Sequence, residues 1–202
     1  MPKLTLADIA DLREYERERE DFRRHVIALK KRRRIHVGPF LTLLFENRDT
    51  IRFQIQEMAR VEKTFTDEGI QTELDVYNPL IPEPGALAAT LFVELTTDDQ
   101  LREWLPKLVG IERHVVLRIG AGGNAIEVRC TVDADHEKQL TRDEITASVH
   151  YIHFQLTSDQ VAAFGDRKVM VRIDHPEYTH ETTLTADNLA ELGADLAGGT
   201  PA

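Results

Sequence analysis

The segment from Thr5 or Asp8 to Arg34 constrains the fold more than any other part of the chain, because it contains neither glycine nor proline. Its apolar residues recur at spacings of three and four, which places them on one stripe of a helix that Arg19 interrupts. The stripe consists of Leu12, Tyr15, Phe22, Val26 and Leu29. Such a helix spans about 45 Å, more than a compact domain of this length needs. We therefore predict a long N-terminal helix that overhangs the rest of the chain and offers a surface for a homodimer.

The end of this helix carries five consecutive cations, from Lys30 to Arg34. Nucleic-acid or anionic-membrane binding would use such a run, but cations also complement the negative end of a helix dipole or meet acidic residues of the same chain or a partner. Residues 1–34 carry eleven Lys and Arg against seven Asp and Glu, a charge of +4, so the rest carries −14 within the net −10. Because an acidic body disfavours nucleic-acid binding, we predict that no nucleic acid is bound.

Alternating apolar residues predict several strands beyond this helix. The expected strands cover 40–46, 87–95, 114–119, 125–132, 149–156, 169–173 and 182–184. Thr97, Thr157 or Ser158, and Thr185 are expected to cap short helices, and the glycine-rich residues 120–124 lead into a strand, which is typical of a hairpin turn. We predict an α+β fold in which the long N-terminal helix packs on a largely antiparallel β-sheet with short helices.

We expect a single domain over residues 1–202. It comprises the N-terminal helix over 1–34, a mixed body over 35–196 and a loose tail over 197–202. The stretch from Thr66 to Gly85 holds three prolines and little periodicity, so we expect a connecting loop there.

Cysteine content and hydropathy predict a cytoplasmic protein. Cys130 is the single cysteine and cannot form an internal disulfide. Neither an apolar signal region behind Met1 nor a run of about 18 apolar residues is present, so we expect no membrane association.

The densest polar chemistry lies between Phe45 and Met58, where a strand passes through a polar turn. We expect ligand or partner contacts from Glu46, Asn47, Arg48, Gln54 and Glu57. Asp49 or Thr50 is expected to cap a helix whose first-turn amides, beside Arg48, would form a small-anion site. Residues 50–55 also alternate as a strand does, so strand and helix both stay open for them.

A second candidate site combines histidines and carboxylates near the C-terminus, which suits zinc or iron. His175 and His180 flank a turn next to Asp174 and form the better pair, whereas His150 and His153 face opposite sides of one strand. A third polar stretch, residues 133–137, lacks the ligand spacing of a calcium loop, and we expect a solvated turn there.

Six stretches along the chain carry a family resemblance. They are Leu4-Thr5, Arg32–Arg34, Leu44–Thr50, Gln54–Met58, Tyr77–Pro82 and Asp174–Tyr178. With these motifs the chain resembles an uncharacterised bacterial family, domain of unknown function 3501. The resemblance implies a redox or oxidative-stress setting, because genes of that family tend to lie beside those for rubrerythrin-like di-iron proteins and iron-sulfur oxidoreductases.

Three functional hypotheses follow. The first is a non-catalytic accessory or interaction protein, serving a redox metalloprotein system, with the N-terminal helix and the Glu46–Met58 junction as contact surfaces. The second is a metal-binding protein or metal-dependent enzyme that uses His175, His180 and nearby carboxylates. The third is a small-anion-binding protein at Arg48.

Overall fold

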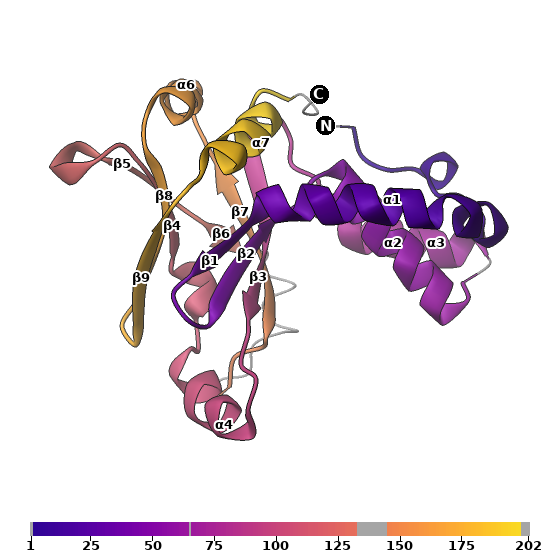
Figure 1. The fold of residues 1–202 in the computed structure, drawn as a ribbon, viewed down its shortest axis with the longest axis horizontal. Helices are drawn as coiled ribbons and strands as arrows, with labels where there is room; N and C mark the ends of the chain where they lie inside the picture. Colours follow the sequence, from indigo (N-terminus) through magenta and orange to yellow (C-terminus); the bar gives the residue numbers. More distant parts are fainter. Residues whose placement is uncertain (1, 65, 133–144, 199–202) are drawn as a thin grey trace.

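The computed structural model describes residues 2–64, 66–132 and 145–198 and shows an α+β fold (Figure 1). Its helices are α1 (Leu12–Arg33), α2 (Arg48–Glu62), α3 (Asp67–Tyr77), α4 (Asp98–Lys107), α6 (Ser158–Asp166) and α7 (Ala186–Leu196). Its strands are β1 (Arg34–Val37), β2 (Leu41–Phe45), β3 (Ala86–Val93), β4 (Val115–Ile119), β5 (Ile126–Arg129), β6 (Thr131–Val132), β7 (Val149–Gln155), β8 (Val169–His175) and β9 (Tyr178–Thr183).

The strands form two antiparallel sheets, in the orders β1-β2-β3-β7-β6 and β5-β4-β8-β9. Chain segment 126–132 belongs to both sheets: β5 pairs with β4, β6 pairs with β7, and the amide of Cys130 between them donates to the carbonyl of Val115. Alternate residues of both sheets point into one shared core, as the period of two requires. Leu43, Leu91 and Val171 are among its fully buried members.

The other face of the five-stranded sheet is partly covered by helices. In Figure 1, α1 runs from the sheets outward, and α2 and α3 accompany its N-terminal half. A second, smaller apolar cluster holds the N-terminal segment, α2 and α3 together; its buried members are Leu4, Ile51, Ile55, Leu74, Leu80 and Ile81. The overhang expected from the length of α1 is therefore present, and α2 and α3 form part of it.

Charged residues join α1 to α2. Glu57 on α2 accepts hydrogen bonds from the Tyr15 hydroxyl at 2.8 Å and from Arg19 Nε at 2.8 Å. One turn away, Arg52 pairs with Glu18 at 2.7 Å. Arg19, which interrupts the apolar stripe in the sequence, is thus a specific partner for α2.

The basic run at the end of α1 meets acidic residues of the same chain. Arg33 is fully buried and donates to the carbonyls of Phe45 and Glu46 at 2.9 and 3.1 Å. It also pairs with Glu191 and Asp195 on α7. This pairing agrees with the interpretation in which the basic run meets acidic residues of the same chain.

Three local predictions need correction. Helix α1 begins at Leu12, because the Asp11 side chain accepts from two first-turn amides and separates α1 from a short turn at Leu6–Asp8. Residues 50–55 are helical, and their cap is Asn47 rather than Asp49 or Thr50. The expected loop after Thr66 contains helix α3, which buries only Leu74 and therefore shows little periodicity in the sequence.

None of the helices in the described part of the chain combines the length and the apolar character that crossing a bilayer requires.

Candidate functional site

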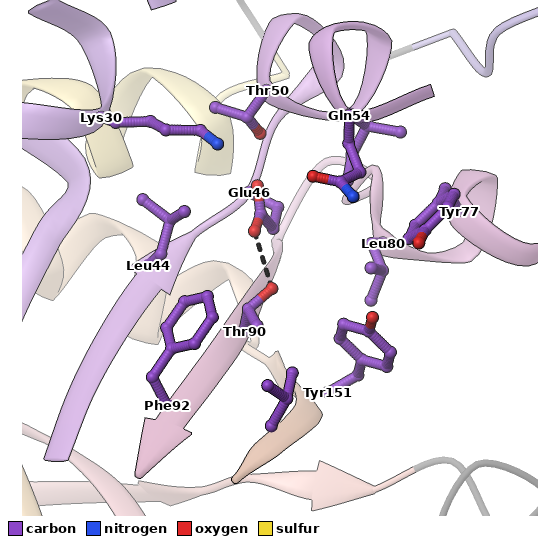
Figure 2. Close-up of a pocket in the computed structure, with 12 residues that line it drawn as sticks. Lys30, Leu44, Glu46, Thr50, Gln54, Tyr77, Leu80, Thr90, Phe92 and Tyr151 are labelled. Atoms are coloured by element: carbon purple, nitrogen blue, oxygen red, sulfur yellow. Dashed lines mark hydrogen bonds between the residues drawn. The ribbon is translucent and has the colours of Figure 1, made fainter. Parts of the chain in front are cut away.

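A groove of about 250 Å³ lies on the helix-covered face of the five-stranded sheet (Figure 2). Strands β2, β3 and β7 form its floor, and the ends of α1, α2 and α3 form its walls. Its lining residues are Lys30, Leu44, Glu46, Thr50, Ile51, Gln54, Tyr77, Leu80, Thr90, Phe92, Val149 and Tyr151. The groove combines an apolar floor with a few polar groups, which is the usual composition of a small-molecule site.

Glu46 is the most deeply buried charged residue of the groove, with 6% of its surface exposed. It follows β2 directly, and its amide continues the pairing with β3 by donating to the carbonyl of Ala88. The Thr90 hydroxyl donates to its Oε1 at 2.7 Å (Figure 2). Its Oε2 accepts no hydrogen bond from any residue that the structure describes and is accessible from the groove, so one carboxylate oxygen remains for a ligand.

Lys30 supplies the positive charge of the groove. It lies on the last turns of α1, and its ammonium group is 5.6 Å from the centre of the Phe53 ring. In Figure 2 its side chain reaches toward Thr50 and Glu46. Within the described ranges it forms no ion pair.

Gln54, Tyr77 and Tyr151 line the other end of the groove. Gln54 projects from α2, and the two phenol groups lie on either side of Leu80 in Figure 2. Burial raises the pKa of Tyr151 to about 12, with a smaller contribution from Tyr77. The Tyr151 phenol is therefore a neutral hydrogen-bonding group near neutral pH.

Three other residues of the junction serve contacts inside the chain. Asn47 and Thr50 form a capping box, in which each side chain accepts from the backbone amide of the other. Glu57 lies on the face of α2 that meets α1, and the Arg19 and Tyr15 hydrogen bonds lower its pKa to about 2. Of the five residues expected at this site, Glu46 and Gln54 line the groove.

Arg48 points away from the groove to the N-terminal segment. Its Nη2 donates to the Asp8 carboxylate at 2.5 Å. The hydrogen bonds from Thr5 and Arg48 lower the pKa of Asp8. The carboxylate of Asp8 already occupies the position of the expected anion, so an external anion would have to displace it. Anion binding at Arg48 therefore stays a prediction. Whether phosphate raises the melting temperature of the protein would test it.

The two histidines expected to bind metal lie in different surroundings. His175 is buried, and its Nδ1 accepts from the amide of Glu177 while its Nε2 donates to the carbonyl of Val109, both at 3.2 Å. His180 is exposed on β9, with its ring 4.5 Å from that of Tyr178. Neither nitrogen of His175 is left to bind a metal in this arrangement.

Asp174 faces the opposite side of β8 from His175, as strand alternation requires. Arg129 binds both of its oxygens, at 3.0 and 2.5 Å, and His114 approaches one of them to 3.1 Å. These contacts lower the pKa of Asp174 to about 2. In the residues that the structure covers, no three His, Cys, Asp or Glu are placed to hold a metal. The zinc or iron hypothesis stays a prediction, which elemental analysis of protein purified without a His tag would test.

The remaining histidine prediction concerned β7. His150 pairs with Leu91 and points into the core, whereas His153 pairs with Ala88 and points to the other face, so the expected separation is confirmed. The polar stretch 133–137, with Asp133, Asp135, His136 and Glu137, lies outside the described residues.

Most groove residues carry no signal in the sequence. Lys30 belongs to a basic run that is typical of the end of a helix. Thr90, Phe92 and Tyr151 lie on the strand face that points away from the shared core. They meet because β3 pairs with both β2 and β7 in a register that places Thr90 beside Leu44 and Tyr151. Strand order and register of this kind are long-range properties that local patterns do not reveal.

Comparison with known proteins identifies a family and a structural relative. A family model described as "Protein of unknown function (DUF3501)" matches residues 3–196. The chain is 38% identical to a crystal structure of a novel protein of unknown function from Burkholderia pseudomallei K96243, with a TM-score of 0.87 over 96% of this chain and 100% of that chain. No curated protein matches. The family resemblance of the sequence is confirmed; the matches carry no information on gene neighbours or partners.

Proposed function

The chain belongs to the DUF3501 family, whose function is unknown, and we propose that it is a non-catalytic accessory protein that binds a ligand or a partner's side chain in the groove. The observation that carries this proposal is the largely buried carboxylate of Glu46, one of whose oxygens has no hydrogen-bond partner among the described residues and faces a groove with an apolar floor. Buried charges are normally paired, so this arrangement favours recognition of an external group.

The composition of the groove supports binding rather than covalent chemistry. Its lining, in the part of the chain that the structure describes, contains neither histidine nor cysteine. Cys130 lies in the core between the sheets, where burial raises its pKa to about 11. A thiol in this state is a poor nucleophile.

The accessory role in a redox or oxidative-stress system is supported by the family resemblance. It predicts a rubrerythrin-like or iron-sulfur oxidoreductase partner in the cytoplasm. Both the groove and the charged outer surface of α1 are available for such a contact, and a homodimer through α1 would compete for the second surface.

Ligand screening by thermal shift tests the binding function. Gln54→Phe places an aromatic ring in the groove, and Gln71→Phe, on the exposed surface of α3, makes the same change elsewhere. We expect ligands to raise the melting temperature of wild type and of Gln71→Phe, but not of Gln54→Phe. If no compound of any charge class separates the two variants, the groove is not a binding site.

Affinity capture from native cells tests the accessory role. Wild type and Gln71→Phe should recover the same redox metalloprotein, and Gln54→Phe should recover less of it. Recovery without any enriched redox protein would contradict the redox assignment.

A further inference from the structure

We infer that the groove binds a small zwitterion of the α-amino-acid class with an apolar side chain, its ammonium group on Glu46 and its carboxylate on Lys30. This inference rests on the proposed binding function and specifies its ligand. Three features of the groove carry it: a largely buried anion that is incompletely paired in the described residues, a cation that forms no ion pair with them, and an apolar floor of limited size.

The first feature is the Glu46 carboxylate. Its single side-chain hydrogen bond in the described structure comes from a neutral donor, the Thr90 hydroxyl. Thr50, the other hydroxyl beside it, is already engaged, because it accepts from the amide of Asn47 and donates to the carbonyl of the same residue. A buried carboxylate with one neutral donor has room for a charged donor, and a ligand ammonium group supplies one.

The second feature is Lys30. A ligand that carried only a positive charge would meet the like charge of this ammonium group in the same groove, which disfavours binding. A ligand that carried only a negative charge would meet Glu46. A zwitterion places each of its charges beside an opposite one and leaves the net charge of the groove unchanged.

The third feature is the floor. Leu44, Phe92 and Val149 are neighbours on β2, β3 and β7, and their side chains form an apolar surface beside the two charges. The volume of about 250 Å³ lies at the small end of ligand pockets. A single amino acid with an apolar side chain suits this space better than a nucleotide or a longer peptide.

Isothermal titration with three related probes tests the inference. L-Phenylalanine carries both charges, 2-phenylethylamine lacks the carboxylate, and 3-phenylpropionate lacks the ammonium group. We expect each single-charge analogue to bind wild type at least ten-fold more weakly than L-phenylalanine. Equal or tighter binding of either analogue would overturn the inference.

Two variants connect each charge to its residue. Glu46→Gln should weaken L-phenylalanine at least ten-fold and not weaken 3-phenylpropionate, and Lys30→Met should weaken L-phenylalanine similarly and not weaken 2-phenylethylamine. Circular dichroism and chemical unfolding show whether each variant is folded. An alternative is that Lys30 forms an ion pair with Glu46 in solution. In that case L-phenylalanine will not bind wild type, and Glu46→Gln will bind 3-phenylpropionate more tightly than wild type does. This result would contradict the inference.

The failure of this inference is distinguishable from failure of the proposed function. If other compounds raise the melting temperature in a way that Gln54→Phe abolishes while L-phenylalanine and L-leucine do not, only the ligand class is wrong. If nothing binds in the groove, the binding function itself is contradicted.

Discussion

Two clusters of charged side chains meet at Glu46 and differ in how their charges are paired. On one side, Arg33 donates to the carbonyls of Phe45 and Glu46 and to the carboxylates of Glu191 and Asp195. On the other side, the Glu46 carboxylate accepts a single hydrogen bond in the described structure, from the Thr90 hydroxyl. Arg33 connects α1, the end of β2 and α7, whereas Glu46 opens onto the groove.

We propose that this difference separates a structural charge from a ligand-binding one. Every nitrogen of the Arg33 guanidinium donates to a group of the same chain, so this charge is used in holding helices to the sheet. Glu46 is almost as deeply buried but retains capacity for one more donor. Burial alone therefore does not distinguish a structural charge from a candidate binding group, whereas incomplete pairing does.

The largest expected effect comes from Arg33→Met. Removal of the guanidinium leaves the buried Asp195 without its cation and leaves Glu191 with Arg32 alone, so we expect a loss of about 3–5 kcal/mol in the free energy of unfolding. Denaturant unfolding measures it. Arg24→Met is the matched control on the same helix, because Arg24 is 74% exposed and pairs with the exposed Asp21; its loss should stay below about 1 kcal/mol. Equal losses in the two variants would remove the distinction between the clusters.

Glu57→Gln should have the next largest effect, and the effect should depend on pH. The folded pKa of Glu57 is about 2, below its ordinary 4.5, because Arg19 and Tyr15 donate to its carboxylate. Its stabilisation is therefore present above pH 4.5 and is lost as the pH falls from there toward 2. We expect Glu57→Gln to lose about 2–3 kcal/mol at pH 7 and to approach wild type near pH 2–3. A difference independent of pH, measured by denaturant unfolding, would contradict the ionised pair.

Glu46→Gln should change stability by less than about 1 kcal/mol, in either direction, because the charge has no cationic partner to lose among the residues that the structure describes. This variant directly tests the contrast with Arg33→Met. Chemical unfolding of the two variants in the same buffer provides the comparison. A loss as large as that of Arg33→Met would mean that Glu46 belongs to the architecture.

Lys30→Met should have the smallest effect on stability, within about 0.5 kcal/mol, since Lys30 has no ion pair in the described structure to lose. Thermal unfolding without ligand measures this change. A larger loss would indicate that Lys30 pairs with Glu46 in solution and that the groove charges satisfy each other.

Local patterns in the sequence predict much of the fold. The caps at Thr97, Thr157 and Thr185 lie where expected, because a threonine that accepts from the third following amide is a local signal. The alternation in β3 and β8 likewise depends only on neighbouring residues. Helix α3 was not predicted because it packs against α2 and the N-terminal segment through few apolar residues, of which only Leu74 is buried.

The candidate site could be predicted only in part, for a physical reason. Glu46 and Gln54 stand out because they lie in a dense polar stretch. The contacts that decide the roles of Arg48 and Glu57 come from Asp8, Arg19 and Tyr15, which are about forty residues away in the sequence. Whether a polar residue is already paired is a property of the tertiary structure.

The pairing of Arg33 with α7 also sets an order in time. Arg33 and Asp195 are separated by 162 positions, so the buried cluster lacks its carboxylates until the last helix has been synthesised. At a synthesis rate of about 5–20 residues per second, Asp195 is added roughly 8–30 seconds after Arg33. The buried cluster can therefore be completed only after α7 has been made.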